Sequence, residues 1–287
     1  MKKFILKIFE FILIVFALLS AIYGTGMYLS QHKQKMNAVY VWGDSQMYQG
    51  LDLKTFSSQI DRTVLSSAEH GNGIYDFLVT IDCIRPQSTC IIALPECALY
   101  RNPLSDSNRT GLSAEALFTL LYSGYPIKEC LRIASLNRNN FYYKPFSSTN
   151  DLYEYASEIV YAEPLNLFCK MFNKPTEYSF WKQKAYVSGL QKLVDMNCRI
   201  ILVQFPFEKQ VEVCAKESVN RLKTDSLVAN VCEKYDISVS NVTLQSDSVL
   251  MHDLSHLNCI GARLVTNHVS TIFNETNNNI LIRFTIQ

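Results

Sequence analysis

Three side chains in this sequence have the types and spacing of a nucleophile, a base and an orienting acid. Ser45 follows a short apolar run that ends at Gly43-Asp44, and Asp253 and His256 lie three residues apart near the C-terminus. A serine hydroxyl attacks an ester efficiently only when a neighbouring base takes its proton and a carboxylate orients that base. Together, Ser45, Asp253 and His256 therefore predict nucleophilic acyl chemistry.

Alternating strands and helices are expected to bring these residues together. Continuous apolar runs that end at turns or prolines predict buried strands at 37–42, 90–94, 199–205 and 237–242, with a weaker candidate at 64–65. Helices are predicted at 74–84, 186–196, 211–235 and 257–272. Strands that are apolar on both faces imply a parallel sheet covered on both sides, with sites at the carboxyl ends of its strands. We therefore expect an α/β fold with 237–242 as its last strand.

Two blocks of the sequence resemble the SGNH (GDSL-like) hydrolase family. Val41-Trp42-Gly43-Asp44-Ser45 is similar to the family's nucleophile block, and Asp253-Leu254-Ser255-His256-Leu257-Asn258 is similar to its Asp-x-x-His block, in the same order along the chain. The resemblance spans about 37–273. It implies a three-layer, flavodoxin-like α/β/α fold in which Ser45 is the nucleophile and Asp253 and His256 complete a catalytic triad.

The resemblance also implies hydrogen-bond donors for an oxyanion. Gly71, with Gly73 as second choice, stands in the place of the family's donor glycine, although an ordinary glycine-rich turn explains both residues as well. The family's Gly-x-Asn-Asp block is absent, because Leu94-Pro95-Glu96-Cys97 follows the third strand. We therefore expect one donor to be missing or supplied from elsewhere, and we interpret Glu96 as a solvated loop carboxylate.

Each candidate residue also has a purely structural interpretation. Ser45 and Asp253 are suitable helix caps, and His256 could be a structural histidine. His252 and His256 have the i, i+4 spacing of two zinc ligands, but the glutamate of His-Glu-x-x-His and an obvious third ligand are lacking, so we expect no metal. Tyrosines could stack on sugar rings or pack within an insertion, at positions 142, 143, 153 and 155.

The first 35 residues are expected to form a membrane anchor. Three lysines within the first seven residues precede an apolar stretch from about Phe11 to Leu29, which approaches the ~20 residues that a spanning helix needs. A cleaved signal peptide is the alternative, but no clear Ala-x-Ala site follows. The lysines favour a cytoplasmic N-terminus, which places the SGNH-like domain at 36–287 outside the cytoplasm. A large, partly helical insertion is expected at about 98–180.

Composition argues against several classes of protein. The formal net charge is +1, and no long Lys/Arg run follows the first residues, so we expect no nucleic acid partner. Neither a Walker A nor a G-x-G-x-x-G motif occurs, so we expect no nucleotide cofactor. The nine cysteines include no C-x-x-C pair. Several lie in apolar runs and are interpreted as buried thiols, with a disulfide between some pair left open.

The combined prediction is a membrane-anchored serine esterase or O-acyltransferase. The resemblance and the anchor imply an acylated carbohydrate or cell-envelope polymer as the substrate, with the acyl group passing from Ser45 to water or to a sugar hydroxyl. Two alternatives stay open. One is a catalytically weak SGNH-like domain that binds glycan or assembles with an envelope protein, and the other is a lipid esterase at the membrane surface.

Overall fold

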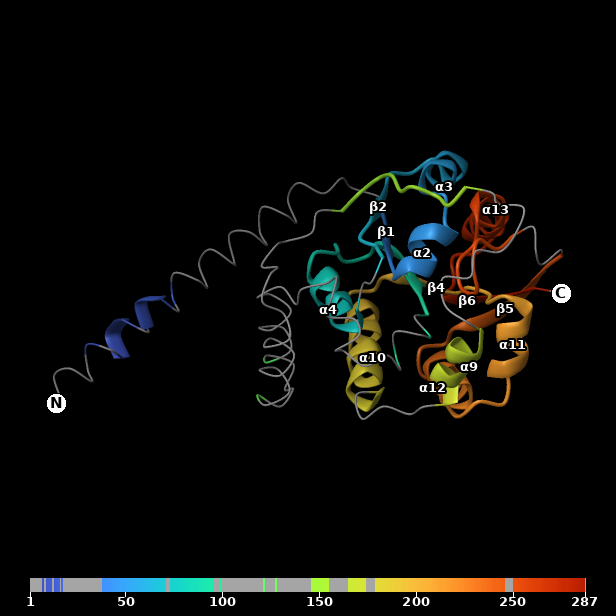
Figure 1. Ribbon diagram of the computed structural model, residues 1–287. Coiled ribbons are helices and arrows are strands. Elements are labelled where there is room, and N and C mark those ends of the chain that lie inside the picture. The colour runs from blue at the N-terminus through green and yellow to red at the C-terminus, as the bar shows by residue number, and fades with distance from the viewer. Residues whose placement is uncertain are drawn as a thin grey trace.

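A six-stranded parallel sheet forms the centre of the protein (Figure 1). Its strand order is β2-β1-β3-β4-β6-β5, and each strand runs parallel to its neighbours. The strands are β1 (Val39–Trp42), β2 (Val64–Ser66), β3 (Thr89–Ala93), β4 (Arg199–Gln204), β5 (Ser238–Leu244) and β6 (Ile280–Ile286). The computed structural model describes residues 7, 9–11, 13–15, 17, 38–70, 73–94, 96, 99, 121, 127, 146–154, 165–173, 179–245 and 250–286.

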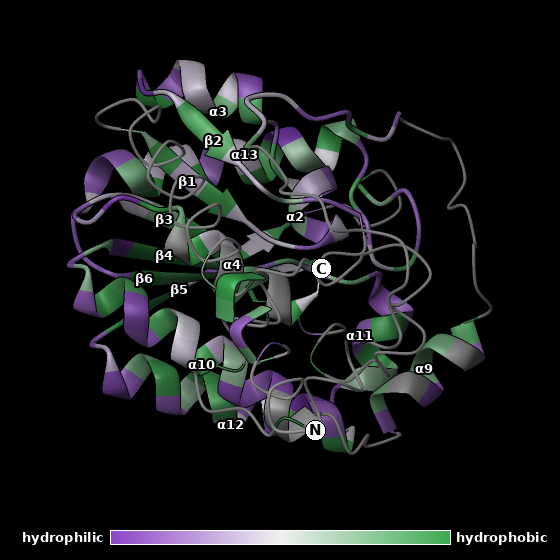
Figure 2. Cartoon of the chain, turned by 90° about the vertical axis from the view of Figure 1, so that its left-hand side faces the viewer, coloured by the Kyte–Doolittle hydropathy of each residue, from purple (hydrophilic) through white to green (hydrophobic). Residues whose placement is uncertain are grey.

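Helices cover both faces of this sheet. Alternate strand residues point to opposite sides, so Tyr40 and Trp42 enter one apolar core while Val39 and Val41 enter the other. The first core packs against α4 (Ile74–Asp82), α10 (Ser179–Asp195) and α12 (Val219–Lys234); the second packs against α2 (Ser45–Gly50), α3 (Leu53–Ile60) and α13 (Cys259–Glu275). Figure 2 shows the apolar strands enclosed between helices whose outer surfaces are largely hydrophilic. The expected α/β class, with a parallel sheet covered on both sides, is confirmed.

The prediction that the chain's last strand lies near 237–242 is wrong. That segment belongs to β5, and β6 follows α13 and lies between β4 and β5. Leu281, Ile282 and Phe284 of β6 are buried because this strand is paired on both sides, whereas β5 lies at the sheet edge and is largely exposed.

The helix predicted at 211–235 is in fact two helices. They are α11 (Lys209–Ala215) and α12, separated at 216–218. Ser218 begins the second helix, because its hydroxyl accepts a hydrogen bond from the backbone N–H of Arg221 at 3.2 Å.

The connections of the first three strands define a site edge. The chain leaves β1, adds β2 on one side, and then crosses to place β3 on the other side of β1. Parallel sheets bind ligands at such a switch point, beyond the carboxyl ends of the strands. Gly43 follows β1 here, and a Cβ on it would lie 2.3 Å from the Cβ of Met47 and 2.8 Å from that of Ala93. Only glycine therefore allows β1 to turn into α2 this close to β3.

Two predicted segments lie mostly outside the described residues. Of the predicted anchor at 1–35, the described residues between 7 and 17 are helical, and Phe9, Phe11, Leu13 and Ile14 are exposed. Within the described part of the chain, we find no helix with the length and apolarity that a bilayer crossing requires. Of the insertion predicted at 98–180, the structure describes chiefly residues 146–154 and α9 (Leu165–Asn173).

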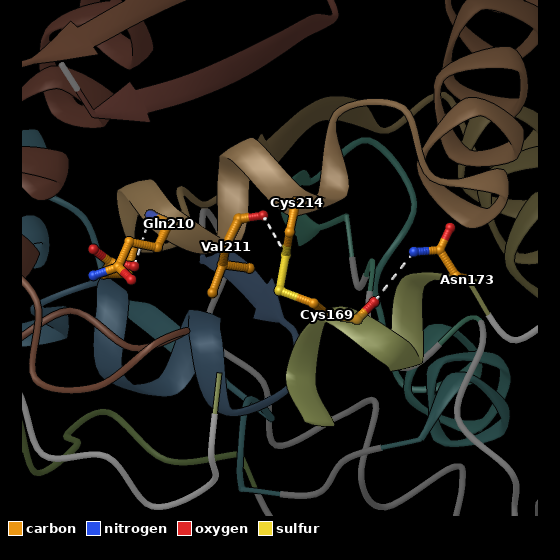
Figure 3. Close-up of a disulfide and its surroundings, with 6 residues drawn as sticks. Cys169, Asn173, Gln210, Val211 and Cys214 are labelled. Atoms are coloured by element: carbon orange, nitrogen blue, oxygen red, sulfur yellow. Dashed lines mark hydrogen bonds between the residues drawn. A yellow bond between two sulfur atoms is a disulfide. The ribbon is translucent and has the colours of Figure 1, made fainter. Parts of the chain in front are cut away.

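A disulfide joins α9 to α11 (Figure 3). Cys169 and Cys214 are bonded, with their Cα atoms 5.8 Å apart. Side chains of the two helices and of two neighbouring loops also form a small apolar cluster made of Phe168, Phe172, Phe207, Val211, Ala215 and Leu254. The prediction of buried thiols holds for Cys83, Cys90 and Cys198, whereas Cys169 and Cys214 form the kind of bond that the sequence left unassigned.

Removing this disulfide should destabilise the protein without changing its fold. We expect the double variant Cys169→Ser, Cys214→Ser to lose about 2–4 kcal/mol of unfolding free energy, because the unfolded chain regains the freedom of a closed loop. Urea denaturation under non-reducing conditions measures this loss, with Cys232→Ser, which removes a free thiol, as the control. Equal unfolding free energies of the double variant and the control would show that Cys169 and Cys214 do not form a stabilising disulfide.

Candidate active site

The structure brings Ser45, His256 and Asp253 into one hydrogen-bonded chain. His256 Nε2 lies 2.7 Å from Ser45 Oγ, and His256 Nδ1 lies 2.7 Å from Asp253 Oδ2. An ionised carboxylate only accepts hydrogen bonds, so Nδ1 carries the proton and Nε2 offers its lone pair to the serine hydroxyl. All three side chains are partly exposed, so a substrate can reach them.

A short closed loop holds the aspartate and the histidine together. Met251 and Leu257 form an antiparallel bridge, and the backbone N–H of His252 donates to the carbonyl of His256 at 2.8 Å. Asn258 then caps α13, with its side-chain oxygen accepting from two backbone N–H groups at the start of that helix. The aspartate is therefore not the cap of α13, and it is available to the imidazole.

Asp253 is kept ionised by its hydrogen bonds. Burial acts to raise its pKa, but the hydrogen bond and charge of His256 and the backbone N–H groups of Ser255 and His256 outweigh burial and hold that pKa below its usual value. Those N–H groups donate to Oδ1 at 2.7 and 2.8 Å. The carboxylate is thus fixed on one oxygen by the backbone and on the other by the imidazole.

Ser45 is placed by the turn from β1 into α2. Asp44 is the N-cap of α2, and its carboxylate accepts from the backbone N–H of Gln46 at 3.0 Å, so the interpretation of Ser45 as the cap is wrong. The amide of buried Gln46 donates to the carbonyl of Ser255 at 3.0 Å. Gln46 therefore fastens the helix that carries Ser45 to the loop that carries His256.

Aromatic and polar side chains surround the hydrogen-bonded residues Ser45, His256 and Asp253. His252 stacks on Tyr153, with ring centroids 4.0 Å apart, and the ring of Tyr153 lies 5.8 Å from that of His256. His70 lies 6.3 Å from His256 and packs against Tyr48. His252 therefore belongs to the wall of the site, a position that the sequence pattern of two histidines did not specify.

The amide of Gln49 defines the protonation of His70. Its oxygen accepts from the backbone N–H of Tyr153 at 2.7 Å, which leaves its nitrogen to donate towards His70 Nε2 at 2.9 Å. Since an amide nitrogen is only a donor, His70 Nε2 accepts and the ring proton sits on Nδ1. His70 is thus a neutral second imidazole beside the site.

Of the two glycines expected to donate to an oxyanion, only Gly73 lies within the described residues. It follows β2 and immediately precedes α4. Gly71 lies outside the described residues. The carboxyl end of β2 does reach the site edge, because His70 lies there.

The interpretation of Glu96 as a solvated carboxylate is wrong. Its residue is 1% exposed, and its Oε1 lies 2.7 Å from Arg221 Nε. Gln204 donates to its other oxygen at 3.3 Å, and Arg221 also pairs with Glu212 at 3.0 Å. Burial raises the pKa of Glu96 to about 7, with Arg221 opposing the rise and Glu212 adding to it. Glu96 therefore links the end of β3 to β4 and α12.

Glu96 should make stability depend on pH near neutrality. The pKa of Glu96 is higher in the folded protein than its usual value of 4.5. The contribution of Glu96 to the unfolding free energy is therefore fully present below pH 4.5 and is lost as the pH rises through about 7. We expect the unfolding free energy to fall by on the order of 3 kcal/mol across this range, and the fall to vanish in Glu96→Gln. Urea denaturation at a series of pH values measures it. Glu233→Gln, which alters an exposed carboxylate on α12, should keep the wild-type slope, and an unchanged slope in Glu96→Gln would contradict the assignment.

Comparison with known proteins does not assign the chain to a family. No family model matches it, and no curated protein matches it. The functional conclusion therefore depends on the residues and geometry described above.

Proposed function

We propose that this protein is a serine esterase or O-acyltransferase of the SGNH type, with a flavodoxin-like fold. The observation that carries the proposal is the chain of two 2.7 Å contacts from Ser45 through His256 to Asp253. The order β2-β1-β3-β4, a serine directly after β1 and an Asp-x-x-His loop before α13 support this proposal, whereas β6 adds a strand between β4 and β5.

The reaction follows from the positions of the protons. His256 Nε2 takes the proton of Ser45 as Oγ bonds to the ester carbonyl carbon, and the carbonyl electrons move onto its oxygen. When those electrons return, the bond to the alcohol oxygen breaks and His256 gives that oxygen the proton. Water or a second hydroxyl then attacks the acyl-serine by the same steps. The backbone N–H groups of Ser45 and Gly71 are our candidates for stabilising the oxyanion.

Substrate and location form part of the same proposal. We propose that the domain lies outside the cytoplasm, held by an N-terminal anchor, and acts on an acylated carbohydrate or envelope polymer. The disulfide between Cys169 and Cys214 supports this location, because such bonds persist in oxidising compartments. The apolar side chains of Phe9, Phe11, Leu13 and Ile14 are exposed, and a surrounding lipid bilayer would cover them. Their exposure therefore supports an N-terminal membrane anchor.

An activity-based probe tests the nucleophile. Full-length protein in mild detergent should be labelled by a fluorophosphonate and should release p-nitrophenol from p-nitrophenyl acetate. Both signals should vanish in Ser45→Ala and fall at least a hundredfold in His256→Ala, whereas Ser226→Ala, which removes an exposed hydroxyl on α12, should behave as wild type. If folded wild-type protein takes no label, the enzymatic proposal is wrong, and the alternative of a non-catalytic binding domain stands.

Replacing Asp253 by asparagine separates orientation from nucleophilicity. The asparagine oxygen still accepts the backbone N–H groups of Ser255 and His256, so the loop should fold as before. Its NH₂ group, however, would face His256 Nδ1 and force the proton onto Nε2, which then cannot accept from Ser45. We expect kcat for p-nitrophenyl acetate to fall on the order of 10³–10⁴-fold with a wild-type melting temperature. A loss below tenfold would show that Asp253 does not orient the base.

A further inference from the structure

One segment of the insertion is bonded both to α2, which carries Ser45, and to the start of α13, which follows the loop of Asp253 and His256. This segment, 146–154, is called the strap here; Figure 1 shows it running past β2 and α3 towards α13. Ser147 exchanges two backbone hydrogen bonds with Ser66 at the end of β2, both 2.7 Å long. The side chain of Asn150 hydrogen-bonds the carbonyls of Tyr48 and Leu51. The strap is therefore fixed where the first strands end.

Tyr153 is held by its backbone from both sides of the site. Its N–H donates to Gln49, one helical turn after Ser45 on α2, and its carbonyl accepts from the N–H of Cys259, the first residue of α13. Both bonds are 2.7 Å long. Both bonds are made by backbone atoms, so they fix the position of this residue whatever its side chain is.

The ring of Tyr153 lies on the alcohol side of the site. His256 returns a proton to the alcohol oxygen of the ester, so the alcohol component must sit beside His256. Tyr153 lies 5.8 Å from that imidazole and stacks on His252 with an interplanar angle of 13°. Both rings are partly exposed. The alcohol component therefore meets a flat aromatic pair as it leaves.

The neighbours of this pair are polar or aromatic. Gln49 and His70 adjoin Tyr153, and Tyr48 packs against His70; each of the three offers a hydrogen-bonding group. Among these described neighbours there is no aliphatic side chain that would receive a fatty chain. A pyranose fits such a surface, because one face of the ring presents C–H groups to an aromatic plane while its hydroxyls reach polar groups at the edge.

We propose that the stacked pair of Tyr153 and His252 is the subsite that recognises the sugar ring of the alcohol component. The proposal rests on the proposed function for the position of the alcohol, and it adds two specificity-determining residues to that function. Loss of the Tyr153 ring should reduce the preference for a sugar ester while the strap, which is held by backbone atoms, stays in place.

The test compares two acetate esters that differ only in the alcohol. Full-length protein is assayed with 6-O-acetyl-D-glucose and with ethyl acetate, and the ratio of the two kcat/KM values is measured. We expect Tyr153→Ala to lower this ratio about tenfold, mainly through a higher KM for the sugar ester, and His252→Ala to lower it about threefold. Tyr153→Phe should keep the ratio, and so should His268→Ala, which removes an exposed histidine of α13. An unchanged ratio in Tyr153→Ala, or a wild-type preference for a long-chain ester, would overturn the subsite.

A binding measurement separates this proposal from the catalytic one. Saturation-transfer NMR with methyl β-D-glucopyranoside needs no turnover, so it can be made on Ser45→Ala. A signal that Tyr153→Ala abolishes supports the subsite even if the fluorophosphonate fails to label Ser45. Absence of a signal at millimolar sugar, in a protein that the fluorophosphonate does label, would overturn the subsite and leave the catalytic proposal standing.

Discussion

The geometry of the candidate site depends on the hydrogen bonds made to one partly buried carboxylate, that of Asp253. Asp253 loses much of its hydration, so it stays ionised only where several donors reach it. The sequence supplies them within three residues, from the backbone N–H groups of Ser255 and His256 and from the His256 imidazole. The same bonds that keep the charge also fix the tautomer of the histidine. A single local loop thereby sets both the electrostatics and the orientation of the base.

The rest of the fold places Ser45, which is distant in the sequence, beside that loop. Ser45 and His256 are 211 residues apart, and they meet because β1 ends at the switch point of a parallel sheet and α13 begins beside it. Two sets of hydrogen bonds then join α2 to this part of the chain: Gln46 is bonded to Ser255, and the strap is bonded to Gln49 and Cys259. Leu254 of the loop also packs into the apolar cluster of the disulfide-linked helices. These contacts join side chains and backbone from separate elements, so the geometry at the serine is determined by tertiary packing.

Features that depend on local pattern could be predicted from the sequence. The apolar runs at β1, β3 and β4 identify buried strands, and Asp253 and His256 share a short loop whose spacing is informative. Features that depend on a distant partner could not. Glu96 resembles a loop carboxylate until Arg221 of α12 is placed beside it, and the position of β6 between β4 and β5 depends on pairing with two strands earlier in the chain. The position of Tyr153 likewise depends on Gln49 and Cys259, which no periodicity connects to it.

The central claim is that Ser45 carries an acyl group during turnover. The most direct measurement mixes full-length protein with p-nitrophenyl acetate, quenches it in acid within milliseconds, and maps the acetylated peptide by mass spectrometry. The account predicts one acetyl group on Ser45 that accumulates before steady state, and none there in Ser45→Ala. Turnover that proceeds with no acetyl group on Ser45, or with the group on another residue, would contradict it.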